Sequence, residues 1–142
     1  MTREVFVDTS YLIATINPRD ALHAAVRRLT RSVRGVRFVT TDLVLVELLS
    51  HYAATEFVRL AAARTVEQLR RASLYEVVEF SRTGFNAAFT VYQARHDKSY
   101  SLVDCHSMLV MKERHIDQVL SSDEHFRQAG FTCLLPIAGR RA

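Results

Sequence analysis

Short apolar segments rich in β-branched and aromatic residues alternate along this chain with longer segments of helical periodicity. The strand-like segments cover residues 4–8, 38–40, 74–80, 118–121 and 131–135. The helical segments cover residues 11–16, 19–33, 42–49, 56–71, 83–95, 102–114 and 123–128. Strands that alternate with helices form a mainly parallel sheet with helices on both faces. We therefore predict an α/β fold with a central, mainly parallel sheet.

Residues with capping and helix-ending preferences mark the helix boundaries. Asn17 and Pro18 suit the start of the helix over residues 19–33, and Thr41 suits the start of the next helix. Ser101 or Ser99 is suited to cap the helix from residue 102, and Gly130 to end the helix over 123–128.

Length and composition predict one domain over residues 1–142. The chain is 49% hydrophobic, which suffices for one core, and its 4 glycines and 2 prolines argue against long linkers. Two cysteines are too few for a disulfide scaffold, no apolar run has the length of a membrane span, and the N-terminus lacks a secretory-signal layout. We therefore predict a cytoplasmic protein with no membrane association.

Four acidic residues adjoin apolar, core-forming sequence. They are Asp8, Glu47, Asp104 and Asp123. A carboxylate next to the core loses hydration, and this is costly unless a cation or hydrogen bonds stabilise its charge. Since no Lys or Arg stands beside these acids in a similar apolar setting, they indicate a site for a hard divalent cation such as Mg2+ or Mn2+.

The predicted topology brings these four acids to one edge of the sheet. Right-handed crossovers align the carboxyl ends of parallel strands, and ligands of open α/β sheets bind at that edge. Asp8 ends the first strand, and Asp123 follows the fourth. We place Glu47 and Asp104 in the first turns of helices that start near the same edge.

Four sequence segments carry a resemblance to a known family. They are Val7-Asp8-Thr9-Ser10, Leu45-Val46-Glu47-Leu48-Leu49, Tyr100-Ser101-Leu102-Val103-Asp104-Cys105, and Leu120-Ser121-Ser122-Asp123-Glu124-His125-Phe126. In this order and spacing, the chain resembles the PIN-domain nucleases, most closely the toxin ribonucleases of VapBC-type toxin–antitoxin pairs. The resemblance covers essentially the whole chain and implies a three-layer α/β/α fold.

The resemblance also implies a function and a set of site residues. Asp8, Glu47, Asp104 and Asp123 match the family's catalytic, metal-binding acids, and Ser10 and Ser121 match hydroxyl positions that support the site. The implied activity is Mg2+- or Mn2+-dependent endonucleolytic cleavage of single-stranded or structured RNA. The implied partners are a small antitoxin protein and a second copy of the chain in a homodimer.

The chemistry of phosphodiester hydrolysis suggests a role for each acid. We expect Asp8 and Asp104 to hold the main metal ion, Glu47 to help hold it or to orient the attacking water, and Asp123 to support a second ion or a coordinated water. Without metal, the four carboxylates repel one another, so some of their pKa values should be raised.

The charge balance leaves other interpretations open. The net charge is +4, and Arg27, Arg28, Arg31, Arg34 and Arg37 form a dense basic group, either a solvated face or a surface for phosphate or an acidic partner. The alternative function is a non-catalytic RNA-binding or assembly domain of the same fold. A phospho-acceptor signalling domain is less favoured because the chain has only two lysines, Lys98 and Lys112. The histidines show no convincing zinc spacing.

Overall fold

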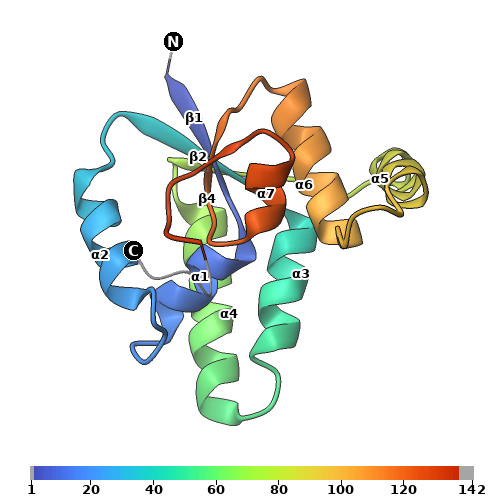
Figure 1. Ribbon diagram of the computed structural model, residues 1–142. Coiled ribbons are helices and arrows are strands. Elements are labelled where there is room, and N and C mark those ends of the chain that lie inside the picture. The colour runs from blue at the N-terminus through green and yellow to red at the C-terminus, as the bar shows by residue number, and fades with distance from the viewer. Residues whose placement is uncertain (1, 138–142) are drawn as a thin grey trace.

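A five-stranded sheet forms the centre of the protein in the computed structural model, which describes residues 2–137 (Figure 1). The strands are β1 (Arg3–Val7), β2 (Val36–Thr41), β3 (Tyr75–Val78), β4 (Gln118–Leu120) and β5 (Thr132–Cys133). Their spatial order is β3-β2-β1-β4-β5, and each neighbouring pair of these described strands is parallel. The predicted parallel α/β sheet is confirmed.

Seven helices over the described residues cover the two faces of the sheet. They are α1 (Thr9–Ile16), α2 (His23–Ser32), α3 (Asp42–His51), α4 (Glu56–Arg71), α5 (Arg82–Ala94), α6 (Leu102–Glu113) and α7 (Glu124–Gln128). The chain moves from β1 to β3 in one direction and then returns across the sheet to β4 and β5. Right-handed crossovers therefore place α1–α4 on one face and α5–α7 on the other. Within these groups α1 contacts α2, α3 and α4, and α6 contacts α5 and α7, while α3 and α6 also contact each other between the groups. Figure 1 shows α2 and α5 at opposite margins of the molecule.

The apolar strand segments form the core between these two helical layers. Val5, Phe6 and Val7 of β1 are fully buried, and so are Val39 of β2 and Val119 of β4. Consecutive buried residues are typical of a parallel strand that is covered on both faces, because side chains alternate between the two faces. Within residues 2–137, no helix combines the length and the apolarity that a membrane crossing needs.

Most predicted helix starts agree with the structure. The Thr41 hydroxyl accepts a hydrogen bond from the backbone N–H of Val44, and the Ser101 hydroxyl accepts one from that of Asp104. The prediction of a helix from residue 19 is wrong, because α2 begins only at His23. Here the side chains of Asn17 and Asp20 accept hydrogen bonds from backbone N–H groups two residues ahead, which stabilises turns in place of a helix.

The basic group of five arginines lies on α2, in the segment that follows it and at the start of β2. All five side chains are exposed, and Arg37 pairs with Glu76 at 3.6 Å between their nitrogen and oxygen atoms. Both interpretations of this basic group, a solvated face and a surface for phosphate or an acidic partner, require exposed side chains, and both stay predictions.

The sheet has its topological switch point between β1 and β4. The connection after β1 leads to one side of the sheet and the connection after β4 leads to the other, so a crevice opens where these neighbouring strands end. Hydrogen bonds fix this edge: the Thr40 hydroxyl donates to the Val7 carbonyl at 2.8 Å, and the Asp8 N–H donates to the Leu120 carbonyl at 3.2 Å. The fold therefore sets Asp8 at the base of the crevice.

Candidate active site

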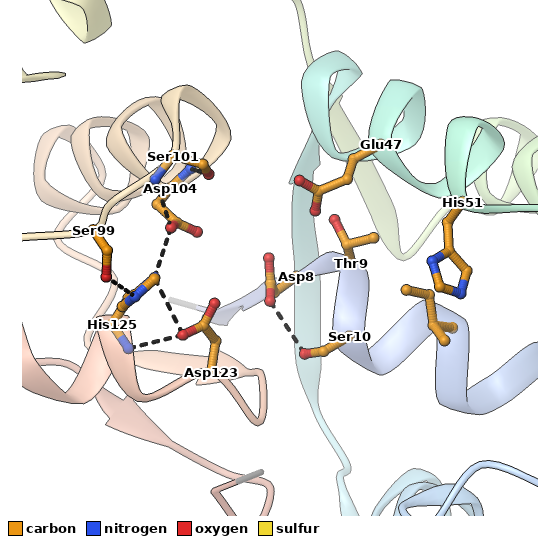
Figure 2. Close-up of a pocket in the computed structure, with 11 residues that line it drawn as sticks. Asp8, Thr9, Ser10, Glu47, His51, Ser99, Ser101, Asp104, Asp123 and His125 are labelled. Atoms are coloured by element: carbon orange, nitrogen blue, oxygen red, sulfur yellow. Dashed lines mark hydrogen bonds and ion pairs between the residues drawn. The ribbon is translucent and has the colours of Figure 1, made fainter. Parts of the chain in front are cut away.

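The four predicted acids line one cavity at the switch point. Asp8 directly follows β1, and Asp123 lies at the N-terminus of α7. Asp104 is in the first turn of α6, as predicted. Glu47 is in the second turn of α3, so the prediction of a first-turn position is wrong for this residue. All four line a cavity of about 390 Å³, and Figure 2 shows their side chains around a common space. The predicted convergence of these residues is therefore present in the structure.

Two serine hydroxyls hold the carboxylate of Asp8. Ser121 Oγ donates to Asp8 Oδ2 at 2.8 Å, and Ser10 Oγ donates to the same oxygen at 3.1 Å. The Ser122 N–H donates to Ser10 Oγ at 3.1 Å, which fixes this hydroxyl from the β4 side. Ser10 and Ser121 thus orient Asp8 across the junction of β1 and β4, and the site-supporting role that the resemblance implies for them stays a prediction.

Burial makes the charge of Asp8 costly. The residue is only 5% exposed, and desolvation raises its pKa from 3.8 to about 6. The Ser121 hydrogen bond lowers the pKa in part, while the negative charges of Asp104 and Glu47 raise it further. Repulsion among the acids, which the sequence predicts, is therefore present, but desolvation is the larger cause.

A capping box fixes Asp104. Its backbone N–H donates to Ser101 Oγ, and its Oδ2 accepts from the Ser101 backbone N–H, both at 3.0 Å. This reciprocal pair satisfies N–H groups that have no partner within the first turn of the helix. Asp104 is only 7% exposed and lines the cavity with its side chain already oriented.

His125 belongs to the site, although its spacing did not single it out in the sequence. Its Nδ1 lies 2.9 Å from Asp104 Oδ2 and 3.3 Å from Asp123 Oδ1 (Figure 2). Since a carboxylate oxygen accepts hydrogen bonds, Nδ1 is the donor toward these acids, and Nε2 shares a hydrogen bond of 3.0 Å with Ser99 Oγ. His125 thus connects two acids that are distant in the sequence. The only sequence signal was its position two residues after Asp123, at the start of the same helix.

Replacing His125 with alanine should disorder this pair of acids. We expect His125→Ala to lower the affinity for a divalent metal or the rate of RNA cleavage by about 10- to 100-fold, because partners that orient metal ligands have effects of this size. Gln128→Ala, an exposed change on the same helix, is the control. Isothermal titration with Mn2+ checks this, and unchanged metal affinity and cleavage in His125→Ala would show that the histidine is dispensable.

The cavity suits a hard divalent cation. Of the described residues that line it, none is Lys or Arg, so no permanent positive charge from a lining side chain offsets the four carboxylates. One ligand atom each from Asp104, Asp123 and His125 lies within 4.8 Å of the others. The buried Thr9 Oγ1, which also lines the cavity, has no hydrogen-bond partner among the described residues. Oxygen-rich donors with uncompensated charge and an unsatisfied hydroxyl fit a hydrated Mg2+ or Mn2+.

Comparison with known proteins places the chain in a family. The family model described as PIN domain matches residues 5–132. The curated "23S rRNA-specific endonuclease VapC20" of Mycobacterium tuberculosis is 32% identical over 136 residues, covering 93% of this chain and 98% of that protein. The chain therefore belongs to the PIN-domain family, as a VapC-type member.

Solved structures agree with this assignment. The crystal structure of Mycobacterium tuberculosis VapC20, described as a "Sarcin-Ricin loop cleaving toxin", has a TM-score of 0.83 and 26% identity over 93% of this chain and 99% of that one. FitAcB from Neisseria gonorrhoeae has a TM-score of 0.64 at 14% identity, covering 91% of this chain and 94% of that one. DNA-bound VapBC from Salmonella typhimurium has a TM-score of 0.58 at 18% identity, with 94% and 97% covered. The last two show the same fold.

Proposed function

We propose that this protein is a divalent-metal-dependent endoribonuclease and the toxin of a toxin–antitoxin pair. The observation that carries the proposal is the convergence of Asp8, Glu47, Asp104 and Asp123 on one cavity at the switch point of a PIN-domain sheet. The similarity to an endonuclease named as specific for 23S rRNA supports RNA as the substrate class. Structured ribosomal RNA is therefore the first substrate to test.

We assign the four acids as the ligands that hold Mg2+ or Mn2+. When bound, such an ion lowers the pKa of coordinated water and neutralises charge on the phosphate. Ser10 and Ser121 keep Asp8 aimed at the cavity. His125 holds Asp104 and Asp123 at a fixed separation. The protein thus forms an acidic cavity that none of its described Lys or Arg side chains lines, and that can bind a metal ion together with a phosphate.

We further propose an antitoxin partner and a homodimer, both in the cytoplasm. The solved structures of FitAcB and of DNA-bound VapBC share the fold, which supports a partner of the antitoxin kind. Four large apolar side chains on α3 and α4 are exposed: Val46, Leu49, Phe57 and Leu60. Because core packing does not bury these residues, they offer apolar area to either partner. Size measurement with and without a co-expressed antitoxin tests both assignments.

Metal removal tests the nuclease function directly. The purified chain is incubated with a panel of ribosomal, transfer and messenger RNA in Mn2+, in Mg2+ and in EDTA. We expect discrete cleavage of a subset of these RNAs with metal and none in EDTA, because the four carboxylates alone repel the phosphate. Folded, antitoxin-free protein that leaves every RNA intact would favour the non-catalytic RNA-binding alternative. Cleavage that persists in EDTA would contradict the metal site.

A further inference from the structure

A second groove adjoins the active-site cavity, and we call it the aromatic groove. It lies between the C-terminal half of α5 and the segment of residues 95–101, and its volume is about 670 Å³. The lining residues that matter here are Phe89, Tyr92, Arg95, Lys98, Ser99 and Tyr100. Figure 1 shows α5 at the outer margin of the molecule, on the side where α6 covers the sheet. None of the four acids lines this groove.

Exposed aromatic side chains form one wall of the aromatic groove. Phe89 is 43% exposed and Tyr92 is 51% exposed. They are three residues apart on α5 and so lie on the same face of the helix. Phe85, one turn earlier, stacks on Phe89 with ring centroids 5.9 Å apart and an interplanar angle of 17°. This aromatic stripe presents flat π-surfaces to a ligand, where a solvated helix face would carry polar residues.

The charge of the aromatic groove is opposite to that of the active-site cavity. Arg95 and Lys98 line the groove and are exposed, and of the described lining residues none carries a carboxylate. The guanidinium of Arg95 lies 5.8 Å from the centroid of the Tyr100 ring. It also donates to both carboxylate oxygens of Asp97, at 3.1 and 3.3 Å, so Arg95 is held in place but partly neutralised, and Lys98 carries the larger part of the net positive charge at the groove. Positive charge beside exposed aromatic rings is suited to a chain of phosphates that carries unstacked bases.

The aromatic groove is continuous with the active-site cavity. Ser99 and Ser101 line both. Ser99 Oγ bonds to His125 Nε2 at 3.0 Å, and the Tyr100 ring packs edge-on against His125 with centroids 5.4 Å apart. An extended polymer bound along the aromatic groove would therefore pass Ser99 and reach the carboxylates of the active-site cavity.

We propose that the aromatic groove binds a single-stranded stretch of the RNA substrate next to the bond that is cut. The bases stack on Phe89 and Tyr92, and the phosphates lie near Arg95 and Lys98. This inference rests on the proposed ribonuclease function and adds a substrate-binding site to it. A second copy of the chain is the less favoured occupant, because a symmetric contact through this face would bring Arg95 and Lys98 of both copies together.

The absence of tryptophan from the sequence gives a direct test. Tyr92→Trp introduces a single indole into the groove, in an Asp8→Asn background that prevents cleavage. The probe is a single-stranded RNA oligonucleotide of mixed sequence, about ten nucleotides long. We expect saturable quenching of the indole fluorescence, because a base stacks on it. Leu74→Trp is the matched control, since Leu74 is 56% exposed and lies at the opposite edge of the sheet, just before β3.

Alanine variants measure the strength of this site by fluorescence anisotropy of the labelled RNA. Phe89→Ala and Tyr92→Ala should each weaken binding by roughly 5- to 100-fold, the range for loss of one stacked base, while Tyr92→Phe and Leu74→Ala should bind as the unchanged chain does. Full affinity in the Phe89→Ala/Tyr92→Ala double variant, or loss of self-association without loss of RNA affinity, would overturn the proposal.

These binding measurements distinguish a failure of the aromatic groove from a failure of the nuclease function, because RNA binding is measured without cleavage. Quenching at position 92 with no RNA cleavage by the unchanged chain would support the aromatic groove and remove the catalytic proposal. Metal-dependent cleavage with full RNA affinity in the double variant would leave the catalytic proposal standing and overturn the groove.

Discussion

The Asp8→Asn chain is expected to lose metal-dependent RNA cleavage by about a thousandfold or more. Asp8 is the most buried of the four acids, and two serine hydroxyls aim its carboxylate. An amide of the same shape keeps an oxygen for these hydroxyls but removes one negative charge from the metal site. Loss of several kcal/mol of metal-supplied transition-state stabilisation corresponds to a rate change of this size. Single-turnover cleavage of a target RNA in Mn2+ measures it.

The same substitution should stabilise the metal-free protein. Because the folded-state pKa of Asp8 is raised from 3.8 to about 6, the folded chain binds this proton more tightly than the unfolded chain does. The cost of the ionised carboxylate is therefore absent below about pH 4, grows as the pH rises to about 6, and is complete above it. Relative to Asp8→Asn, the unchanged chain should lose up to about 3 kcal/mol of unfolding free energy across this interval. Urea unfolding in EDTA at several pH values measures the difference.

Asp117→Asn is the matched control for both effects. Asp117 is exposed and directly precedes β4, at the opposite end of this strand from the cavity. The Asp117→Asn substitution removes the same formal charge without changing a residue of the cavity, so the rate of RNA cleavage and its pH profile should be unchanged. An Asp8→Asn chain that is unfolded in EDTA would show that Asp8 has a structural role, and one that cleaves RNA at the normal rate would exclude Asp8 as a metal ligand.

The sequence predicted the parts of the site that depend on strand order. Asp8 and Asp123 follow strands, and parallel strands end at the same edge, so pattern alone brings these two residues together. The prediction put Glu47 one turn too early in its helix. With Thr41 as the N-cap, α3 starts at Asp42, so Glu47 is the sixth residue and lies in the second turn. It reaches the cavity nonetheless, since α3 begins at this edge.

Contacts between helices could not be predicted in this way. The role of His125 depends on how the short helix α7 turns back towards α6, which brings two residues 21 positions apart to 2.9 Å between Nδ1 and the carboxylate of Asp104. The delayed start of α2 likewise depends on turns closed by Asn17 and Asp20, whose side chains compete with helical hydrogen bonds. Periodicity records which residues face the core, but it contains no signal for such local competition or for the angle between two helices.

Millimolar Mn2+ is expected to raise the melting temperature of the protein by roughly 10 °C at about pH 7.5. An ion that binds only the folded state at about a hundred times its dissociation constant adds about 2.7 kcal/mol of unfolding free energy, and each kcal/mol shifts the midpoint of a domain of this size by several degrees. Binding also relieves the uncompensated charge of the buried Asp8. Differential scanning fluorimetry with and without EDTA measures the shift.

This stabilisation should decrease below pH 6. The metal ion and a proton compete for Asp8, whose pKa is about 6 in the metal-free protein. Below that pH, the metal affinity falls about tenfold for each unit by which the pH is lowered, which is a loss of about 1.4 kcal/mol of binding free energy. Asp8→Asn should show a smaller shift at every pH, and Asp117→Asn the full shift. A shift that is equal at about pH 5 and about pH 7.5, or equal in Asp8→Asn, would place the ion elsewhere on the protein. A full, pH-dependent shift without RNA cleavage would keep the metal site and favour the non-catalytic RNA-binding alternative, because metal affinity and turnover would then be separate properties of the same four acids.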